Sequence, residues 1–210
     1  MRRGRKRSEG EETARRILHA AEEHFAAEGL AGARTDRIAL AARANKALLY
    51  YYFGDKKRLH RAVLDNLLRQ FRVLVLEAPE KASSVREKLV AIVTAYFEFL
   101  ATHPNYPRLV QREALDPRGG YFDRMRSELF RPLHELLAQT LAEGIAAGEF
   151  RKVDTPQLAH IILGMTTSYF AAAPIVSRFS GQNLLAPGVL AKRKRALLDF
   201  VDHGVARQGA

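Results

Sequence analysis

The stretch of sequence that decides the fold is residues 35–59, which read TDRIALAARANKALLYYYFGDKKRL. Apolar residues recur in it at helical spacing on both sides of a short break at residues 43–45. Thr35 and Asn45 are suitable N-caps for two short helices, and Gly54 is a suitable end for the second. Two helices joined by so short a connection predict a helix-turn-helix.

The sequence on both sides of this stretch is also helical. A first helix that contains Ile17 and Phe25 is predicted to end at Gly29. The run Ser8-Glu9-Gly10-Glu11 is a possible capping box at its start. Asp55 is the expected cap of a long helix in which Leu59, Val63, Leu67, Phe71 and Leu74 share one face.

The rest of the chain continues the helical pattern. Ser84, with Glu87 three residues on, and Thr155, followed by Pro156, are the expected starts of two of its helices. Helical periodicity covers about residues 85–102, 108–115, 122–147, 156–179 and 189–205. No run alternates in the manner of a strand, so the sequence predicts an all-α fold.

Composition narrows the class of protein. The chain has 210 residues, 47% of them hydrophobic, and a formal net charge of +11. It has no cysteine, which excludes disulfides and thiolate metal sites and is typical of a cytoplasmic protein. No stretch reaches the roughly 18 uninterrupted apolar residues of a membrane span, and no apolar region follows the basic N-terminus, so neither a membrane span nor a signal peptide is expected.

The positive charge is concentrated near the helix-turn-helix. Residues 1–60 hold 14 Lys or Arg against 8 Asp or Glu, which is more than half of the excess. In the second helix of the motif, Leu49 and Phe53 can face the core, but the adjacent residues Tyr50, Tyr51 and Tyr52 cannot all be buried on one side. Exposed tyrosines beside lysines suit contacts to phosphate and sugar. Core packing is the alternative interpretation of the tyrosines.

At this point the sequence resembles the tetracycline-repressor (TetR) family of transcriptional regulators. The resemblance rests on residues 17–29, 35–39 and 49–59, in that order and with the spacing of the family. It implies a three-helix DNA-binding domain with a basic N-terminal arm, over residues 1–58. It also implies a larger helical effector-binding and dimerisation domain over residues 59–210. The expected protein is a homodimeric repressor on a palindromic operator, released by a small, mostly apolar ligand.

The resemblance also implies which residues meet double-stranded DNA. Thr35 and Lys56 would contact phosphates, and the tyrosines would touch phosphates or sugars. Lys46, Ala47 and Leu48 would meet base edges, where apolar side chains suit a thymine methyl group. The predicted DNA-binding set is Thr35, Arg43, Asn45, Lys46, Ala47, Leu48, Tyr50, Tyr51, Tyr52 and Lys56.

Arg43 is a departure from the family, because glycine usually occupies this turn position. If the turn keeps a left-handed conformation there, a residue other than glycine costs about 1 kcal/mol. Two alternatives are a reshaped turn and a side chain that reaches a phosphate.

Two further sets of residues are predicted for the larger domain. The effector would contact Phe97, Arg112, Phe122, Met125, His134 and Tyr169. A partner subunit would contact Ile161, Ile162, Met165, Leu197, Phe200 and Val201, on the last two long helices. Ordinary core packing is the alternative for both sets.

Other basic segments have two interpretations each. The arm Arg2–Arg7 would enter the minor groove or remain an unstructured tail, and Lys192–Arg195 would form a second nucleic-acid patch or a solvated helix end.

Motifs for metal or cofactor chemistry are absent from the sequence. No histidine has Glu three residues before it, and there is no His-Glu-x-x-His, glycine-rich phosphate loop or serine elbow. No metal, cofactor or enzymatic activity is therefore expected. The rival hypotheses are a non-specific DNA-binding protein and an all-helical enzyme with a basic surface.

Overall fold

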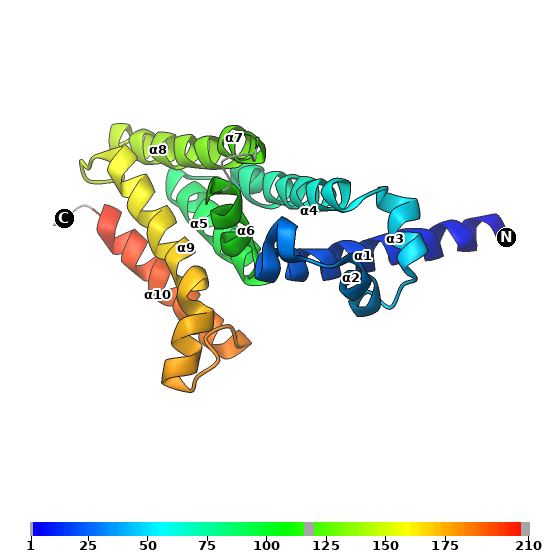
Figure 1. The fold of residues 1–210 in the computed structure, drawn as a ribbon. Helices are drawn as coiled ribbons and strands as arrows, with labels where there is room; N and C mark the ends of the chain where they lie inside the picture. Colours follow the sequence, from blue (N-terminus) through cyan, green and yellow to red (C-terminus); the bar gives the residue numbers. More distant parts are fainter. Residues whose placement is uncertain (1, 116–119, 207–210) are drawn as a thin grey trace. The chain divides into compact units, whose positions relative to one another are not determined.

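The structure is a computed structural model that describes residues 2–115 and 120–206, with side chains from residue 9 onward. Within those ranges every regular secondary-structure element is a helix (Figure 1). The sole β-type pairing there is an isolated bridge between Phe150 and Ala206. The predicted all-α fold is confirmed.

The chain divides into two compact units. The N-terminal unit comprises residues 1–69 and 108–119, and the C-terminal unit comprises residues 70–107 and 120–210. The structure thus places the division later than the expected boundary after residue 58. The reason is that α4 (Lys56–Phe71) is one uninterrupted helix whose first fourteen residues pack with the N-terminal unit.

The N-terminal unit is built on three mutually packed helices: α1 (Arg2–Gly32), α2 (Thr35–Ala41) and α3 (Lys46–Phe53). Their core consists of side chains that are fully buried, among them Ile17, Phe25, Ile38 and Leu49. α1 breaks at Gly29, whose φ of 72° and ψ of 175° are not helical, which agrees with the predicted end of the first helix.

Two of the predicted helix starts are wrong in this unit. α1 begins at Arg2 and runs through the proposed capping box at residues 8–11. Thr35 is the first residue of α2 and not its cap, because Arg34 occupies the cap position and makes no capping bond with its side chain. The Thr35 hydroxyl instead lies 3.2 Å from the Tyr50 hydroxyl.

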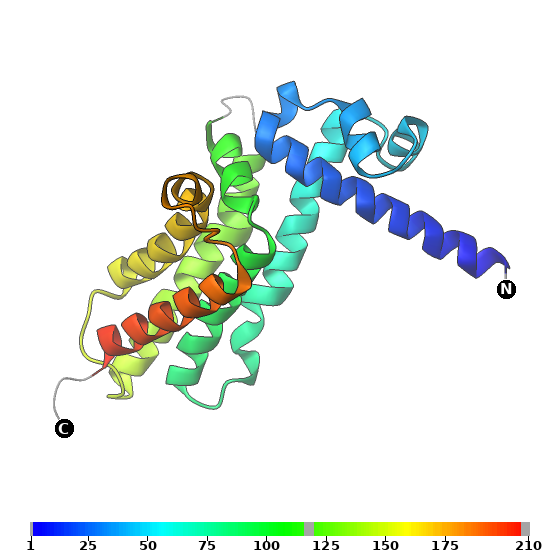
Figure 2. The ribbon, with the colours of Figure 1, turned by 90° about the horizontal axis from the view of Figure 1, so that it is seen from below.

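The C-terminal unit is arranged around α5 (Val85–Thr102). α8 (Arg131–Ala146), α9 (Thr155–Ser180) and α10 (Pro187–Val205) pack against it, and Figure 2 shows α9 and α10 in yellow to red. Shorter elements complete the unit: a π-helical turn η1 (Arg72–Leu76), a 3-10 helix η2 (Ala78–Lys81), α7 (Tyr121–Met125) and a second π-helical turn η3 (Arg126–Phe130). α6 (Tyr106–Leu115) begins in this unit and continues in the other.

Local hydrogen bonds explain where these helices begin. Ser84 Oγ accepts a bond from Glu87 N, and Glu87 Oε2 accepts one from Ser83 N, as expected for the start of α5. The predicted cap of α9 is wrong by one residue. Asp154 Oδ1 accepts from Gln157 N at 3.0 Å, because a carboxylate is well placed at the positive end of a helix.

We predict that Gly144→Ala destabilises the C-terminal unit. A Cβ on buried Gly144 would overlap the ring of Phe150, whose backbone N–H also donates to Gly144 O. The free energy of unfolding should fall by about 2 kcal/mol, measured by urea denaturation. Gly204→Ala is the control, since nothing lies within 4 Å of its Cβ position and alanine favours a helix. Equal effects of the two changes would contradict the prediction.

Candidate nucleic-acid interface

α3 is the element that presents the candidate site. The Leu49 side chain is fully buried and fixes which face of this eight-residue helix points inward. Asn45 Oδ1 accepts a bond from Ala47 N at 2.9 Å, which confirms Asn45 as the N-cap. Gly54 ends the helix with a φ of 78°, a conformation that favours glycine. Lys46, Ala47 and Leu48 are consequently exposed on the first turn.

The three tyrosines of α3 have different surroundings. Tyr51 is 80% exposed, and Tyr50 is exposed with its hydroxyl against that of Thr35. Tyr52 is half-buried, with its ring edge-to-face with Tyr51. Its hydroxyl lies 3.0 Å from where a Cβ on Gly10 would be. The prediction that the three cannot all be buried is confirmed, and Tyr52 acts as a strut between α3 and α1.

The turn between α2 and α3 keeps the left-handed conformation at Arg43, with a φ of 50°. Ala44 N donates to Ala39 O and Arg43 N donates to Leu40 O, which is the bond pattern of a Schellman motif. Glycine is usual at this position because a Cβ is strained there. The side chain of Arg43 is exposed, so its guanidinium is available to a ligand outside the protein.

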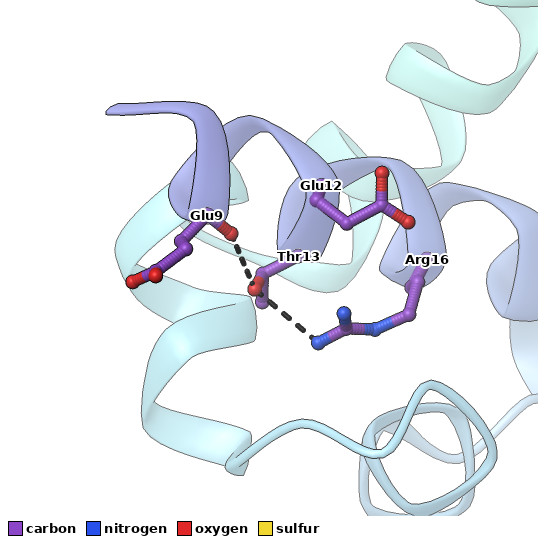
Figure 3. A pocket seen from close by; sticks show the side chains of 4 residues that line it. All are labelled: Glu9, Glu12, Thr13 and Arg16. Atoms are coloured by element: carbon purple, nitrogen blue, oxygen red, sulfur yellow. Dashed lines mark hydrogen bonds between the residues drawn. The ribbon is translucent and has the colours of Figure 1, made fainter. Parts of the chain in front are cut away.

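Arg16 supports the same turn from α1. Its Nε donates to the carbonyl oxygen of Ala42, the C-cap residue directly after α2, and its Nη2 donates to the Thr13 hydroxyl. Figure 3 shows this side chain at the edge of an open hollow of about 470 Å³, which is lined by Glu9, Glu12, Thr13 and Arg16. Sequence reasoning missed Arg16, because its partner lies 26 residues further along the chain.

Asp55 and Lys56 at the start of α4 have separate tasks. Asp55 Oδ1 accepts from Arg58 N at 2.8 Å, which confirms it as the cap of α4, and this backbone bond lowers the pKa of the Asp55 carboxyl. Lys56 Nζ donates to Ala31 O and Ala33 O at 3.2 Å. Its ammonium therefore holds the end of α1 with two of its three N–H donors, and its predicted contact with phosphate stays a prediction.

The basic segment Arg2–Arg7 forms the first turns of α1 by its backbone. Its side chains lie outside the described residues, so their predicted contact with DNA stays a prediction.

Comparison with known proteins identifies the fold family of this arrangement. Residues 17–63 match the bacterial regulatory proteins of the tetR family, and residues 86–201 match the tetracyclin repressor-like C-terminal domain. The second match alone covers more than half of the chain. This chain belongs to the tetR family. The resemblance read from its sequence is thereby confirmed, and the chain belongs with DNA-binding regulators rather than with enzymes.

Individual tetR relatives agree with this result. The HTH-type transcriptional repressor SCO4008 of Streptomyces coelicolor is 37% identical over 106 residues, which are 50% of this chain and 52% of that protein. The chain therefore spans about half the length of this curated relative.

Solved structures share the fold over nearly the whole chain. The ketosteroid transcriptional regulator KstR2 of Mycobacterium tuberculosis has a TM-score of 0.73 and 21% identity, with 92% of this chain and 96% of that chain covered. The regulator FadR from Bacillus subtilis, in complex with stearoyl-CoA, has a TM-score of 0.61 and 22% identity, with 90% and 98% covered.

Arg112, which the sequence places at the effector of this tetR protein, forms hydrogen bonds to the backbone of α1 in the structure. Its Nε donates to Ala26 O and its Nη2 to Ala27 O, at the carbonyl end of α1 before the break at Gly29. Arg112 also belongs to the N-terminal unit. In this structure Arg112 thus caps α1, and its predicted contact with an effector stays a prediction.

The other five predicted effector residues do not line one common hollow among those that the structure describes. Phe97 and Met125 are buried, with Phe97 edge-to-face against Phe170. The remaining contacts are separate pairs: Phe122 with Phe130, His134 with His160, and the Tyr169 hydroxyl with Leu184 O. Partial burial raises the pKa of Tyr169, and the charge of Arg193 on its ring opposes the shift.

The predicted dimer residues divide into two groups. Ile162, Leu197 and Val201 lie in the core of the subunit, where they have almost no surface to offer a partner. Ile161 and Phe200 are 50% and 59% exposed, and Met165 is half-buried. Of the six predicted dimer residues, Ile161 and Phe200 therefore offer the largest exposed surface on α9 and α10 to a partner subunit.

We predict that Arg43→Gly stabilises the chain. Glycine removes the Cβ strain at the left-handed turn, which should raise the free energy of unfolding by about 0.5–1 kcal/mol in urea denaturation. Arg37→Gly is the matched control, because Arg37 is an exposed arginine inside α2. There glycine should cost about 1 kcal/mol. A loss of stability from both changes would refute the strain at Arg43.

Proposed function

We propose that this chain is a cytoplasmic repressor that binds a palindromic DNA operator as a homodimer and releases it on binding a small, mostly apolar ligand. The observation that carries the proposal is the exposed first turn of α3, where Lys46, Ala47 and Leu48 stand free above the buried Leu49. A capped helix with exposed cationic, methyl-bearing and phenolic side chains fits the major groove.

The cations around α3 support a DNA partner. Arg37, Arg43, Lys46 and Lys57 are exposed on or beside the two helices of the motif. Such side chains neutralise phosphates, while the hydroxyls of Tyr50 and Tyr51 suit phosphate oxygens. Ala47 and Leu48 would contact thymine methyl groups, so part of the sequence preference would be apolar.

The surface of α9 supports a homodimer. Ile161, Ile175 and Phe179 are exposed along one side of this helix, and Phe200 is exposed on α10. Exposed apolar patches of this kind mark interaction sites. A second copy of the chain is the natural partner, because a palindromic operator needs two recognition helices about 34 Å apart.

The apolar character of α9 has a second explanation that we reject. By length and composition alone, α9 is the one helix of the described residues that would cross a membrane, and only 28% of its most apolar stretch is buried. However, Ile162, Thr166 and Phe170 are buried on one side of α9, which packs against α5 and α8. A helix with one side in a protein core and one side apolar suits a partner subunit.

Two observations favour a ligand in the C-terminal unit. FadR from Bacillus subtilis, which has the same fold, binds stearoyl-CoA, a molecule with a long apolar chain. Here, α4 reaches from Lys56 beside α3 to Phe71 in the buried core of the C-terminal unit. A ligand that displaces Phe71 would shift the start of α4 and with it the recognition helices, which couples the two sites.

Selection from a pool of random DNA duplexes tests the proposal directly. The full chain should enrich one palindrome whose half-sites are one helical turn apart. A non-specific DNA-binding protein would bind the pool without enrichment, and that outcome would end the repressor hypothesis.

We predict that Lys46→Ala weakens binding to the selected palindrome about tenfold and lowers the slope of log affinity against log salt by about 1, because one cation leaves the DNA surface. Fluorescence anisotropy at several salt concentrations measures both quantities. Lys192→Ala makes the same charge change on an exposed lysine of α10 and should leave the slope unchanged. Parallel losses in the two variants would mean that net charge alone drives binding.

A second prediction concerns the dimer. Ile161→Glu places a carboxylate on the exposed apolar side of α9 and should weaken dimerisation at least tenfold in analytical ultracentrifugation. Val73→Glu is the control, because Val73 is similarly exposed but lies on η1. A dimer that tolerates Ile161→Glu as well as it tolerates Val73→Glu would place the interface elsewhere.

A further inference from the structure

The C-terminal unit contains a buried hydroxyl that belongs to Tyr106. The Tyr106 side chain is 1% exposed, and its Oη has no partner among the described residues. Its ring stacks on Phe71 with centroids 6.3 Å apart and meets the edge of Phe99 at 5.1 Å. A hydroxyl that loses water and gains no partner is destabilising, so phenylalanine would be the more stable residue at this position.

Tyr96 in the same aromatic cluster is a buried tyrosine whose hydroxyl does have a hydrogen-bond partner. It is also buried and lies edge-to-face with Phe71 at 6.0 Å. Its hydroxyl, however, is 2.6 Å from the Thr167 hydroxyl. Within the described part of the chain, the cluster thus gives one phenol a hydrogen-bond partner and leaves the other without one, although both are surrounded by aromatic rings. A buried polar group without a hydrogen bond requires an explanation. A bound ligand would explain it, because a ligand atom would be the missing hydrogen-bond partner of the hydroxyl.

We propose that Tyr106 Oη is the polar contact of the effector subsite, and that the effector is a neutral, mostly apolar molecule with a carbonyl or hydroxyl oxygen at this end. The inference rests on the proposed function, since it names the ligand class of the same regulator. The rings of Phe71, Tyr96 and Phe99 would contact the apolar part, and the ligand oxygen would bond to Tyr106.

The surroundings argue for a neutral group and against a carboxylate. His103 stacks on Phe99 and is the titratable base beside the cluster. A neutral ring has one N–H, so it donates either to Phe99 O, 3.0 Å from Nδ1, or to Gln70 Oε1, 3.2 Å from Nε2. Burial lowers the pKa of His103, which keeps the ring neutral at pH 7. A buried carboxylate here would have no positive partner, and that is costly.

The position of the cluster in the chain suits a switch. Phe71 is the last residue of α4 and Tyr106 is the first residue of α6. The remainder of both helices, up to residue 69 in α4 and from residue 108 in α6, belongs to the N-terminal unit. A ligand that separates these two rings would therefore act on the ends of two helices that continue into the unit with α3.

The first experiment compares Tyr106→Phe with Tyr96→Phe in the full chain by thermal unfolding. Tyr106→Phe removes a hydroxyl without a partner, so the midpoint should stay level or rise. Tyr96→Phe removes a bonded hydroxyl, so the midpoint should fall by a few degrees. A fall of the same size in Tyr106→Phe would mean that its hydroxyl is already satisfied in the folded protein, and it would overturn the proposal.

The second experiment uses three probes of similar size: acetophenone, ethylbenzene and benzoate. Calorimetry with the wild-type chain should show acetophenone binding at least fivefold more tightly than ethylbenzene, with benzoate weaker than acetophenone. Tyr106→Phe should remove the preference for acetophenone and leave ethylbenzene unchanged. Failure of the wild-type chain to prefer acetophenone, or an unchanged preference in Tyr106→Phe, refutes the subsite.

These measurements separate the subsite from the proposed repressor. Selection of a palindrome by the wild-type chain tests the repressor and involves no probe, whereas the preference for acetophenone involves no DNA. A chain that selects no palindrome but binds acetophenone through Tyr106 would refute the repressor alone. Operator binding without that preference would refute the subsite alone.

Discussion

A helix as short as α3 does not persist in water by itself, and the proposed DNA surface depends on this constraint. Its eight residues are held by the burial of Leu49, by the cap at Asn45 and by the end at Gly54. The Tyr52 side chain packs α3 against Gly10 of α1, and Arg16 donates a hydrogen bond to the turn between α2 and α3. The exposed side chains of α3 are therefore positioned by the packing of the N-terminal unit.

Two positions keep a residue that is less stable than an available alternative. Arg43 has a left-handed backbone where glycine would be unstrained, and Tyr106 buries a hydroxyl where phenylalanine would have none. Proteins tend to retain such residues where binding requires them, at the expense of stability. One of these lies beside the proposed DNA surface and the other in the proposed effector subsite, which is the distribution expected of a ligand-responsive regulator.

The C-terminal unit has more apolar surface than its own core uses. α9 buries Ile162 and Phe170 against its neighbours and still exposes Ile161 and Phe179 on the opposite side. An isolated subunit would expose that apolar side to water, and dimerisation would bury it. A homodimer formed through this side of α9 would carry two copies of α3, the number that a palindrome requires.

The sequence by itself determined the all-helical fold, the family resemblance, the caps at Asn45, Asp55 and Ser84, and the exposure of Tyr51. The caps could be predicted because each depends on residues a few positions apart. Only the tertiary structure decided the tasks of the residues with distant partners. Arg112 caps α1 from 86 residues away, and Arg16 bonds to the end of α2. The burial of Ile162, and the lack of a partner for Tyr106 Oη among the residues that the structure describes, likewise follow from which helices meet in space. Helical periodicity holds no information on that pairing.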